Sequence, residues 1–283
     1  VDGRRAGRDR NRLAVVDAAL AAKVPARLEE AAPVTLWHQV DADFREPRAS
    51  FYFSVRSAAA NETARSAVLT ELYTRVVKDE LNEFTYPASL AGLDYDLYRH
   101  VRGFTVRIDG FDERQPLLLD AILARLTGPA LAADRFAVAR EQLIRSLENS
   151  RKDPPYSQAA REVTDLMVRP SWTVSQRLVA LEDLTVADLA AWVPRLLERI
   201  EVVALAHGNL DRGAALAMSD MLRTKLLAGR APTVVPPAGV VRLGAGDYYG
   251  RELSIDHPDS AIALYFQGPD KRYANRAAAE MLG

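Results

Sequence analysis

The fold is decided by residues 79–111, which read DELNEFTYPASLAGLDYDLYRHVRGFTVRIDGF. The first part of this stretch is predicted to end a helix, because apolar residues recur there at helical spacing. The segment around Pro87 is predicted to be a loop, since proline lacks the N–H that a helix interior needs. The remainder alternates apolar and polar residues, a pattern that indicates two strands of a hairpin.

The hairpin assigns the side chains of the two strands to two faces. A two-residue turn at Arg102-Gly103 would pair Val101 with Phe104. Each residue before Val101 would then pair with the residue equally far after Phe104. One face is then mostly apolar and is expected to pack on helices. The other face is polar enough to meet water or a substrate cavity. Its side chains are Asp96, Tyr98, His100, Thr105, Arg107 and Asp109.

The rest of the sequence predicts further strands and helices around this hairpin. Strands are expected at residues 35–40, 50–57 and 200–206, where apolar residues alternate or run together. Asn61 is expected to cap a helix that reaches Phe84, and Thr185 to cap another with Asp188 three residues on. Further helices are predicted at residues 113–126, 134–151, 157–168 and 209–227. This order favours an α+β fold, with an antiparallel-rich mixed sheet and helices packed on one face.

Composition excludes several classes of partner. The 283 residues are 48% hydrophobic and 27% charged, with a formal net charge of −1, so no strong field draws the chain to nucleic acid or to anionic membranes. No apolar run approaches the ~18 residues that cross a bilayer. Cysteine is absent, which removes disulfides, thiolate nucleophiles and Cys-ligated zinc. Because the chain starts at Val1, we expect it to begin inside a longer polypeptide.

Two linkers and a weak repeat suggest the domain organisation. The arginine-rich start of the chain is expected to be a solvated linker, and the Pro/Gly-rich residues 229–239 a second one. PRASFYFSV at residues 47–55 finds a counterpart in PDSAIALYF at residues 258–266, about 210 residues later. Each copy precedes a helix start, so the second copy is expected to open a further, truncated domain.

No complete catalytic constellation is found. None of the four histidines lies in HxxEH or HExxH, the spacings that place two imidazoles on one metal. Asp41 and Asp43 are expected to cap a loop rather than bind a cation, and no serine lies in a GxSxG elbow. The sequence therefore offers no catalytic and no metal-binding residue. The histidines are His38, His100, His207 and His257.

Five phrases resemble the pitrilysin/insulysin branch of the M16 zinc metalloproteases. They are LWHQVDADFREPRA (36–49), KDELNEFTYPASLAGLDYDL (78–97), GFDERQPLLLDAI (110–122), HGNL (207–210) and DSAIALYF (259–266). The resemblance implies four related α+β domains, arranged as two halves around a closed chamber, with HxxEH on a helix of the first domain. Residues 35–230 would be the third, inactive domain, between linkers at 1–34 and 231–249. Residues 250–283 would start the fourth.

On this resemblance the chain is a non-catalytic segment of a peptide-degrading endopeptidase. Zinc would belong to the parent enzyme, because the helix in the place of the zinc helix has no histidine. The partners would be the N-terminal half of the same protein and peptide substrates. The residues expected to face the chamber are Tyr98, His100, Thr105 and Arg107. A periplasmic location is expected, with the cytoplasm as the alternative.

Three alternatives stay open at this stage. The parent could be the related protease that processes the precursor peptide of pyrroloquinoline quinone. It could instead be a metal-free scaffold subunit of a two-subunit M16 complex. An unrelated helical binding module is the third alternative, and the order of the matched phrases argues against it.

Overall fold

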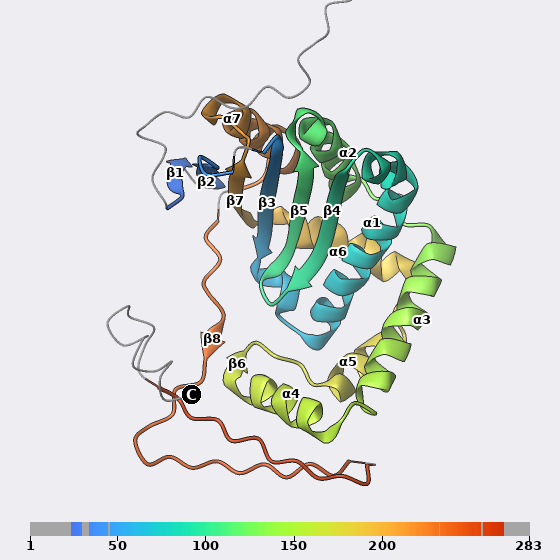
Figure 1. Ribbon diagram of the computed structural model, residues 1–283. Coiled ribbons are helices and arrows are strands. Elements are labelled where there is room, and N and C mark those ends of the chain that lie inside the picture. Colours follow the sequence, from blue (N-terminus) through green and yellow to red (C-terminus); the bar gives the residue numbers. More distant parts are fainter. Residues whose placement is uncertain (1–23, 30–33, 45, 232, 256, 269–283) are drawn as a thin grey trace, which may run out of the picture.

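A six-stranded mixed sheet forms the centre of the computed structural model, which describes residues 24–29, 34–44, 46–231, 233–255 and 257–268 (Figure 1). The strand order is β1-β2-β7-β3-β5-β4. β2 and β7 run parallel, and the other neighbouring pairs are antiparallel. The strands are β1 (Ala26–Glu29), β2 (Val34–Val40), β3 (Arg48–Ser57), β4 (Leu93–His100), β5 (Gly103–Phe111) and β7 (Ile200–Gly208).

Helices cover one face of this sheet, as Figure 1 shows. The covering helices are α1 (Ala64–Leu90), α2 (Gln115–Thr127), α6 (Val186–Glu198) and α7 (Arg212–Met221). Between α2 and α6 the chain forms α3 (Ala133–Ser150), α4 (Pro155–Met167) and α5 (Val174–Leu181). Of these, α3 and α5 pack on α1. The predicted α+β fold, with an antiparallel-rich mixed sheet and helices on one face, is confirmed.

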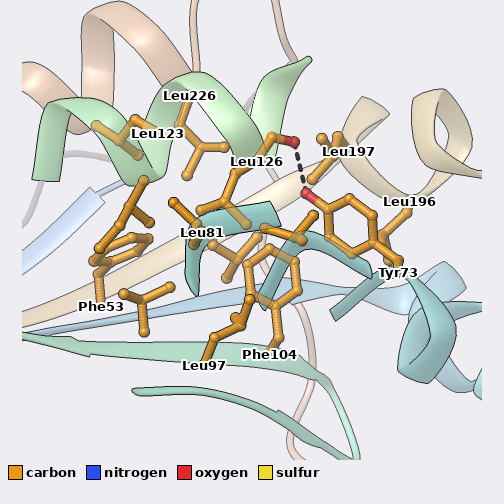
Figure 2. Close-up of a cluster of buried hydrophobic side chains, with 14 of the residues drawn as sticks. Phe53, Tyr73, Leu81, Leu97, Phe104, Leu123, Leu126, Leu196, Leu197 and Leu226 are labelled. Atoms are coloured by element: carbon orange, nitrogen blue, oxygen red, sulfur yellow. Dashed lines mark hydrogen bonds between the residues drawn. The ribbon is translucent and has the colours of Figure 1, made fainter. Parts of the chain in front are cut away.

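The hydrophobic core lies between the sheet and the helices. Every second residue of β3 and β5 points into it, and Phe53 and Phe104 are fully buried there (Figure 2). The ring of Tyr73, from α1, lies 5.6 Å from that of Phe104. Its hydroxyl donates a hydrogen bond of 2.6 Å to the carbonyl oxygen of Leu126. This bond satisfies the one polar atom of a ring that is otherwise surrounded by apolar side chains.

Both predicted ends of α1 are wrong. The N-cap is Thr63, whose hydroxyl accepts the N–H of Ser66 at 3.0 Å, while the hydroxyl of Ser66 accepts the N–H of Thr63 at 2.8 Å. Asn61 instead ends the short helix η1 (Ala58–Asn61), and its side chain donates to the carbonyl oxygen of Pro170. At the other end, α1 continues through Pro87 to Leu90. Pro87 is exposed and lies in the last turn, so the hydrogen bond that it cannot donate is lost only at the end of the helix, where three residues follow it.

The hairpin turn lies one residue earlier than predicted. β4 and β5 pair Leu97 with Val106 and Tyr98 with Thr105, so the turn is Val101-Arg102. Gly103 follows it at a φ of +148°, and a Cβ there would lie 2.1 Å from the carbonyl oxygen of Val55. This close approach to β3 fixes where the second strand starts. The register is therefore two residues away from the predicted one, and both faces of the hairpin keep their predicted members.

Other boundaries differ from prediction by a few residues. α2 follows a short helix η2 (Asp112–Arg114), and the capping pair of Thr185 and Asp188 on α6 is confirmed. α7 is capped by Asp211 rather than Asn209 and passes into a π-helical turn, η3 (Leu222–Leu226). Asp211 accepts the N–H of Ala214 at 2.7 Å, a bond that Asn209 is too far upstream to make.

Two regions of the linkers carry structure that the sequence did not predict. β1 lies within the expected linker 1–34 and adds an edge strand beside β2. A two-stranded sheet joins β6 (Val168–Arg169) to β8 (Gly239–Val240). Residues 258–266, expected to repeat β3, form no strand in the described part of the chain, and Ile262 and Phe266 are exposed. Among the described residues, the backbone of this segment makes no hydrogen bond to another segment, which a β-strand requires.

Some predictions fall outside the described residues, namely the basic start of the chain and the helix expected after the second repeat copy. Among the helices that are described, none combines the length and the apolar character needed to span a membrane.

Candidate functional site

The face of the sheet opposite the helices, called here the open face, is the candidate functional site. Its side chains alternate with the buried ones and are half-buried or exposed. Figure 1 shows β3, β5 and β4 in front, with α1, α2 and α6 behind them. The strands β2, β7, β3, β5 and β4 each contribute residues to it. They include Trp37, Leu205, Tyr52, Val203, Ser54, Thr105, Arg107, Tyr98, His100, Arg56 and Glu201.

The strand register arranges the open face in rows that cross the sheet. One row runs from Trp37 on β2 through Leu205 and Tyr52 to Arg107 on β5. The next row contains Val203, Ser54, Thr105 and Tyr98. A further row, nearest the β4–β5 turn, contains Glu201 and Arg56. Neighbours in a row lie about 5 Å apart, so side chains of one row touch.

The four residues predicted to face the chamber all lie on the open face. Tyr98 and Thr105 are direct cross-strand partners, and Tyr98 is 45% exposed. His100 follows Tyr98 on β4, and Arg107 follows Thr105 on β5. The structure thus brings the four together over two adjacent strands. Their contact with a substrate stays a prediction.

Arg107 is held in place by neighbours on the same face. Its guanidinium carbon lies 5.4 Å from the centre of the Tyr52 ring, and its Nε pairs with the carboxylate of Asp109. Asp109 in turn accepts the hydroxyl of Ser50 at 2.6 Å. The hydrogen bond to Asp109 raises the pKa of Arg107. The charge of Arg107 is therefore fixed and locally compensated.

Ser54 and His100 form a pair that superficially resembles a nucleophile with its base. His100 Nε2 lies 2.9 Å from the Ser54 hydroxyl, and the N–H of Arg102 donates to Nδ1 at 3.2 Å. Because Nδ1 accepts, the neutral ring carries its proton on Nε2 and donates to Ser54. Burial, with smaller contributions from Arg102 and Arg56, lowers the pKa of His100 to about 4. An imidazole that donates to a serine cannot take its proton, so the pair is structural.

The described residues do not fit a zinc site. No group of three or more His, Cys, Asp or Glu among them is arranged to hold a metal ion. His38 is buried, with Nε2 2.7 Å from the carbonyl oxygen of Leu210, and His100 is bound to Ser54. Asp41 accepts the N–H groups of Asp43 and Phe44, so it caps a loop as expected. No step of a metal-dependent reaction can be assigned to these side chains.

Sequence reasoning missed the apolar part of the open face. Trp37 is 36% exposed, and Tyr52, Val203 and Leu205 are half-buried. Alternation along residues 35–40 would have placed Trp37 opposite the core. At residues 200–206, however, the apolar residues run together and give no alternation, although β7 buries only every second residue. The parallel pairing of β2 with β7, which joins Trp37 to Leu205, has no local signal in the sequence.

Comparisons with known proteins agree with this fold. A sequence model described as the middle or third domain of peptidase M16 matches residues 11–180. Human insulin-degrading enzyme is 31% identical over 249 residues, covering 86% of this chain and 24% of that protein. A fission-yeast protein named putative zinc protease is 31% identical over 187 residues, covering 66% of this chain and 19% of its own length. The crystal structure of pitrilysin superposes on this protein with a TM-score of 0.69 and 19% sequence identity. The match covers 74% of this chain and 22% of the pitrilysin chain.

The fold and the open face define an α+β domain with one face of its sheet covered by helices and the other partly exposed. The chain belongs to the peptidase M16 family and corresponds to its middle or third domain. It spans about a quarter of the length of the insulin-degrading enzymes that it matches.

Proposed function

We propose that this chain is the non-catalytic middle segment of a zinc-dependent endopeptidase that degrades peptides. Its open face would form part of the wall of the substrate chamber. The family match and the names of its relatives, an insulin-degrading enzyme and a putative zinc protease, support a role in peptide hydrolysis. Zinc would be held by another domain of the parent protein, because the described residues form no group of three or more His, Cys, Asp or Glu that could hold a metal ion.

The observation that carries this proposal is the asymmetry of the sheet. One face is sealed by α1, α2, α6 and α7, while the other presents half-exposed side chains that are already ordered by their neighbours. A surface whose side chains are already ordered loses little conformational entropy when it contacts a substrate. Tyr98, His100, Thr105 and Arg107 are proposed as contacts on that wall.

A charge reversal on the open face tests the proposal in the full-length protease. Arg107→Glu would leave three carboxylates together, with Asp96 and Asp109, and Lys78 as the nearby cation. We expect kcat/KM for acidic peptides to fall about 10-fold relative to basic peptides of the same length, as like charges meet in the chamber. Rates for both peptide classes that match the wild type would show that the open face does not meet the substrate.

The control variant is Arg145→Glu on α3, an exposed arginine paired with Glu141 away from the sheet. It introduces the same charge change and is expected to leave the peptide preference unaltered. Metal analysis of the full-length protein separates the alternatives. One zinc per chain with chelator-sensitive hydrolysis supports the protease, whereas a metal-free, inactive full-length protein would indicate a scaffold subunit.

A further inference from the structure

One end of the open face already holds a segment of the chain itself. Val235, in the extended segment between η3 and β8, is 6% exposed, whereas its neighbour Val234 is 75% exposed. The N–H of Val235 donates to Glu201 Oε2 at 3.2 Å, and its carbonyl oxygen accepts from Arg102 Nη1 at 3.4 Å. Glu201 also lies 3.6 Å from Arg56, so the holding groups belong to the row nearest the β4–β5 turn.

This contact shows what chemistry the open face accepts. The main chain of Val235 is bound by one carboxylate and one guanidinium, and its aliphatic side chain is removed from water. The bound residue is uncharged and sits in a segment without helix or strand. This end of the open face thus binds the main chain of an uncharged residue whose side chain is buried.

The next rows offer apolar side chains that stay partly exposed, although guanidinium groups lie over two of the rings, Arg27 at 5.8 Å from the centre of Trp37 and Arg107 at 5.4 Å from that of Tyr52. Trp37, Leu205 and Tyr52 lie side by side in one row, and Val203 lies beside Leu205 on the same strand. The hydroxyls of Tyr98 and Thr105 border this apolar patch and make no hydrogen bond within the described part of the chain. They are available to main-chain groups of a bound peptide.

The charges of the open face favour an uncharged occupant. Arg107 pairs with Asp109, and Arg56 lies against Glu201. At the sheet edge, Asp96 accepts from Lys78 at 2.6 Å. Since these charges are compensated within the protein, a charged peptide side chain would gain little from them. An aromatic or aliphatic side chain would gain the burial of its own surface and of the exposed patch.

We propose that Trp37, Leu205, Tyr52 and Val203 form a subsite for an aromatic or large aliphatic side chain of an extended peptide, with Val235 marking the neighbouring position. This inference rests on the proposed function, because it takes peptides as the ligand. It deepens that function by naming the residues that select among peptides and the side chains that they select.

The test uses the 283-residue chain itself and two neutral, end-capped peptides, Ser-Ser-Phe-Ser-Ser and Ser-Ser-Ala-Ser-Ser. Titrations followed by amide NMR give both the dissociation constants and the location of binding. We expect the Phe peptide to bind about 10-fold more tightly than the Ala peptide, as partial burial of an aromatic ring implies. The perturbed amides should lie on β2, β7 and β3.

Two variants examine the subsite and one serves as a control. Leu205→Asn keeps the size of the side chain, and Trp37→Ala removes the ring; each should reduce the Phe-over-Ala preference to about 3-fold or less. Val179→Ser removes an apolar side chain on α5 that is 63% exposed and should leave the preference at its wild-type value. Thermal unfolding of each variant shows that the comparison is made between folded proteins.

Several outcomes would overturn the inference. These are equal binding of the two peptides, no binding at millimolar peptide, and an undiminished preference in folded Leu205→Asn and Trp37→Ala. The result is separable from that of the Arg107→Glu experiment. If Arg107→Glu alters the charge preference of the full-length protease but the 283-residue chain shows no preference for the Phe peptide, the proposed chamber wall stands and the proposed apolar subsite is wrong. If instead the chain prefers the Phe peptide but Arg107→Glu leaves the protease unchanged, the open face binds peptides but does not line the substrate chamber.

Discussion

The two faces of the central sheet are made from the same strands yet are stabilised in different ways. On the helix face, Phe53 and Phe104 are fully buried and pack against α1 and α2. On the open face, the residues that alternate with them, such as Ser54 and Thr105, stay partly exposed, and the Ser54 hydroxyl lies 2.9 Å from His100 Nε2 on β4. The difference teaches that one face supplies most of the stability, so the other is free to vary for recognition.

The largest contrast is expected between adjacent residues of β3. Phe53→Ala removes a fully buried ring and should lower the free energy of unfolding by about 3–5 kcal/mol, because a cavity is left in the core. Tyr52→Ala, one residue earlier on the open face, should cost about 1 kcal/mol. Urea unfolding measures both. Equal losses would show that the open face is as important for stability as the core.

A smaller effect is expected from the ion cluster at the edge of the helix face. Glu71 is the carboxylate shared by Arg75, Arg99 and Arg177, at 2.9, 4.0 and 2.7 Å. Glu71→Gln removes the carboxylate that three guanidinium groups share, and burial already lowers the pKa of Arg99. We expect a loss of about 2 kcal/mol in unfolding free energy. Glu141→Gln, in an exposed pair on α3, is the control and should change it by less than ~0.5 kcal/mol.

The open face should make stability depend on pH through His100. Its folded-state pKa of about 4 lies below the value near 6.5 that is expected when unfolded, so the unfolded state binds the proton first. Stability should therefore fall as the pH drops from about 6.5 to 4 and not above that range, by about 1 kcal/mol after allowance for solvent screening.

His100→Gln removes this titration and should flatten the profile over the same range. His207→Gln, at an exposed ring on the same face, is the comparison variant. Unfolding free energies measured from pH 4 to 7 decide the matter. A His100→Gln profile as steep as that of the wild type would contradict the assignment.

The smallest effect is expected for Arg107→Gln. The side chain is about half exposed, and its contacts with Tyr52 and Asp109 lie at the surface. We expect less than about 1 kcal/mol of destabilisation, with the coupling to Asp109 in a double-mutant cycle of similar size. A loss near that of Phe53→Ala would mean that this surface is a second core.

The two faces also differ in how far the sequence predicts them. Parity along each strand assigns a residue to a face even when the register is wrong, which is why the hairpin prediction survived a two-residue shift. The position of the turn could not be read locally, because it depends on Gly103 lying against the carbonyl of Val55 on another strand. The loop predicted around Pro87 was wrong for a similar reason, since α1 continues through this proline in its exposed last turn.

The members of the candidate site were only partly predictable. Tyr98, His100, Thr105 and Arg107 come from one hairpin, so local alternation brings them together. Trp37 and Leu205 are more than 160 residues apart in sequence, and their pairing depends on the strand order. Val235 likewise contacts Glu201 from a separate segment. Such contacts are set by tertiary packing, for which a single sequence carries no periodic signal.

The position of β7 has a consequence for how the chain is made. β2 and β3 are neighbours in sequence, but in the sheet they are separated by β7, which bonds to both. A nascent chain that lacks β7 therefore has one unpaired edge on β2 and one on β3, although β1 and β5 can pair with their other edges. Such edges are a hazard for aggregation, and long-range pairing of this kind slows folding. We expect ribosome-bound chains to acquire protease resistance only after residue 208 has emerged.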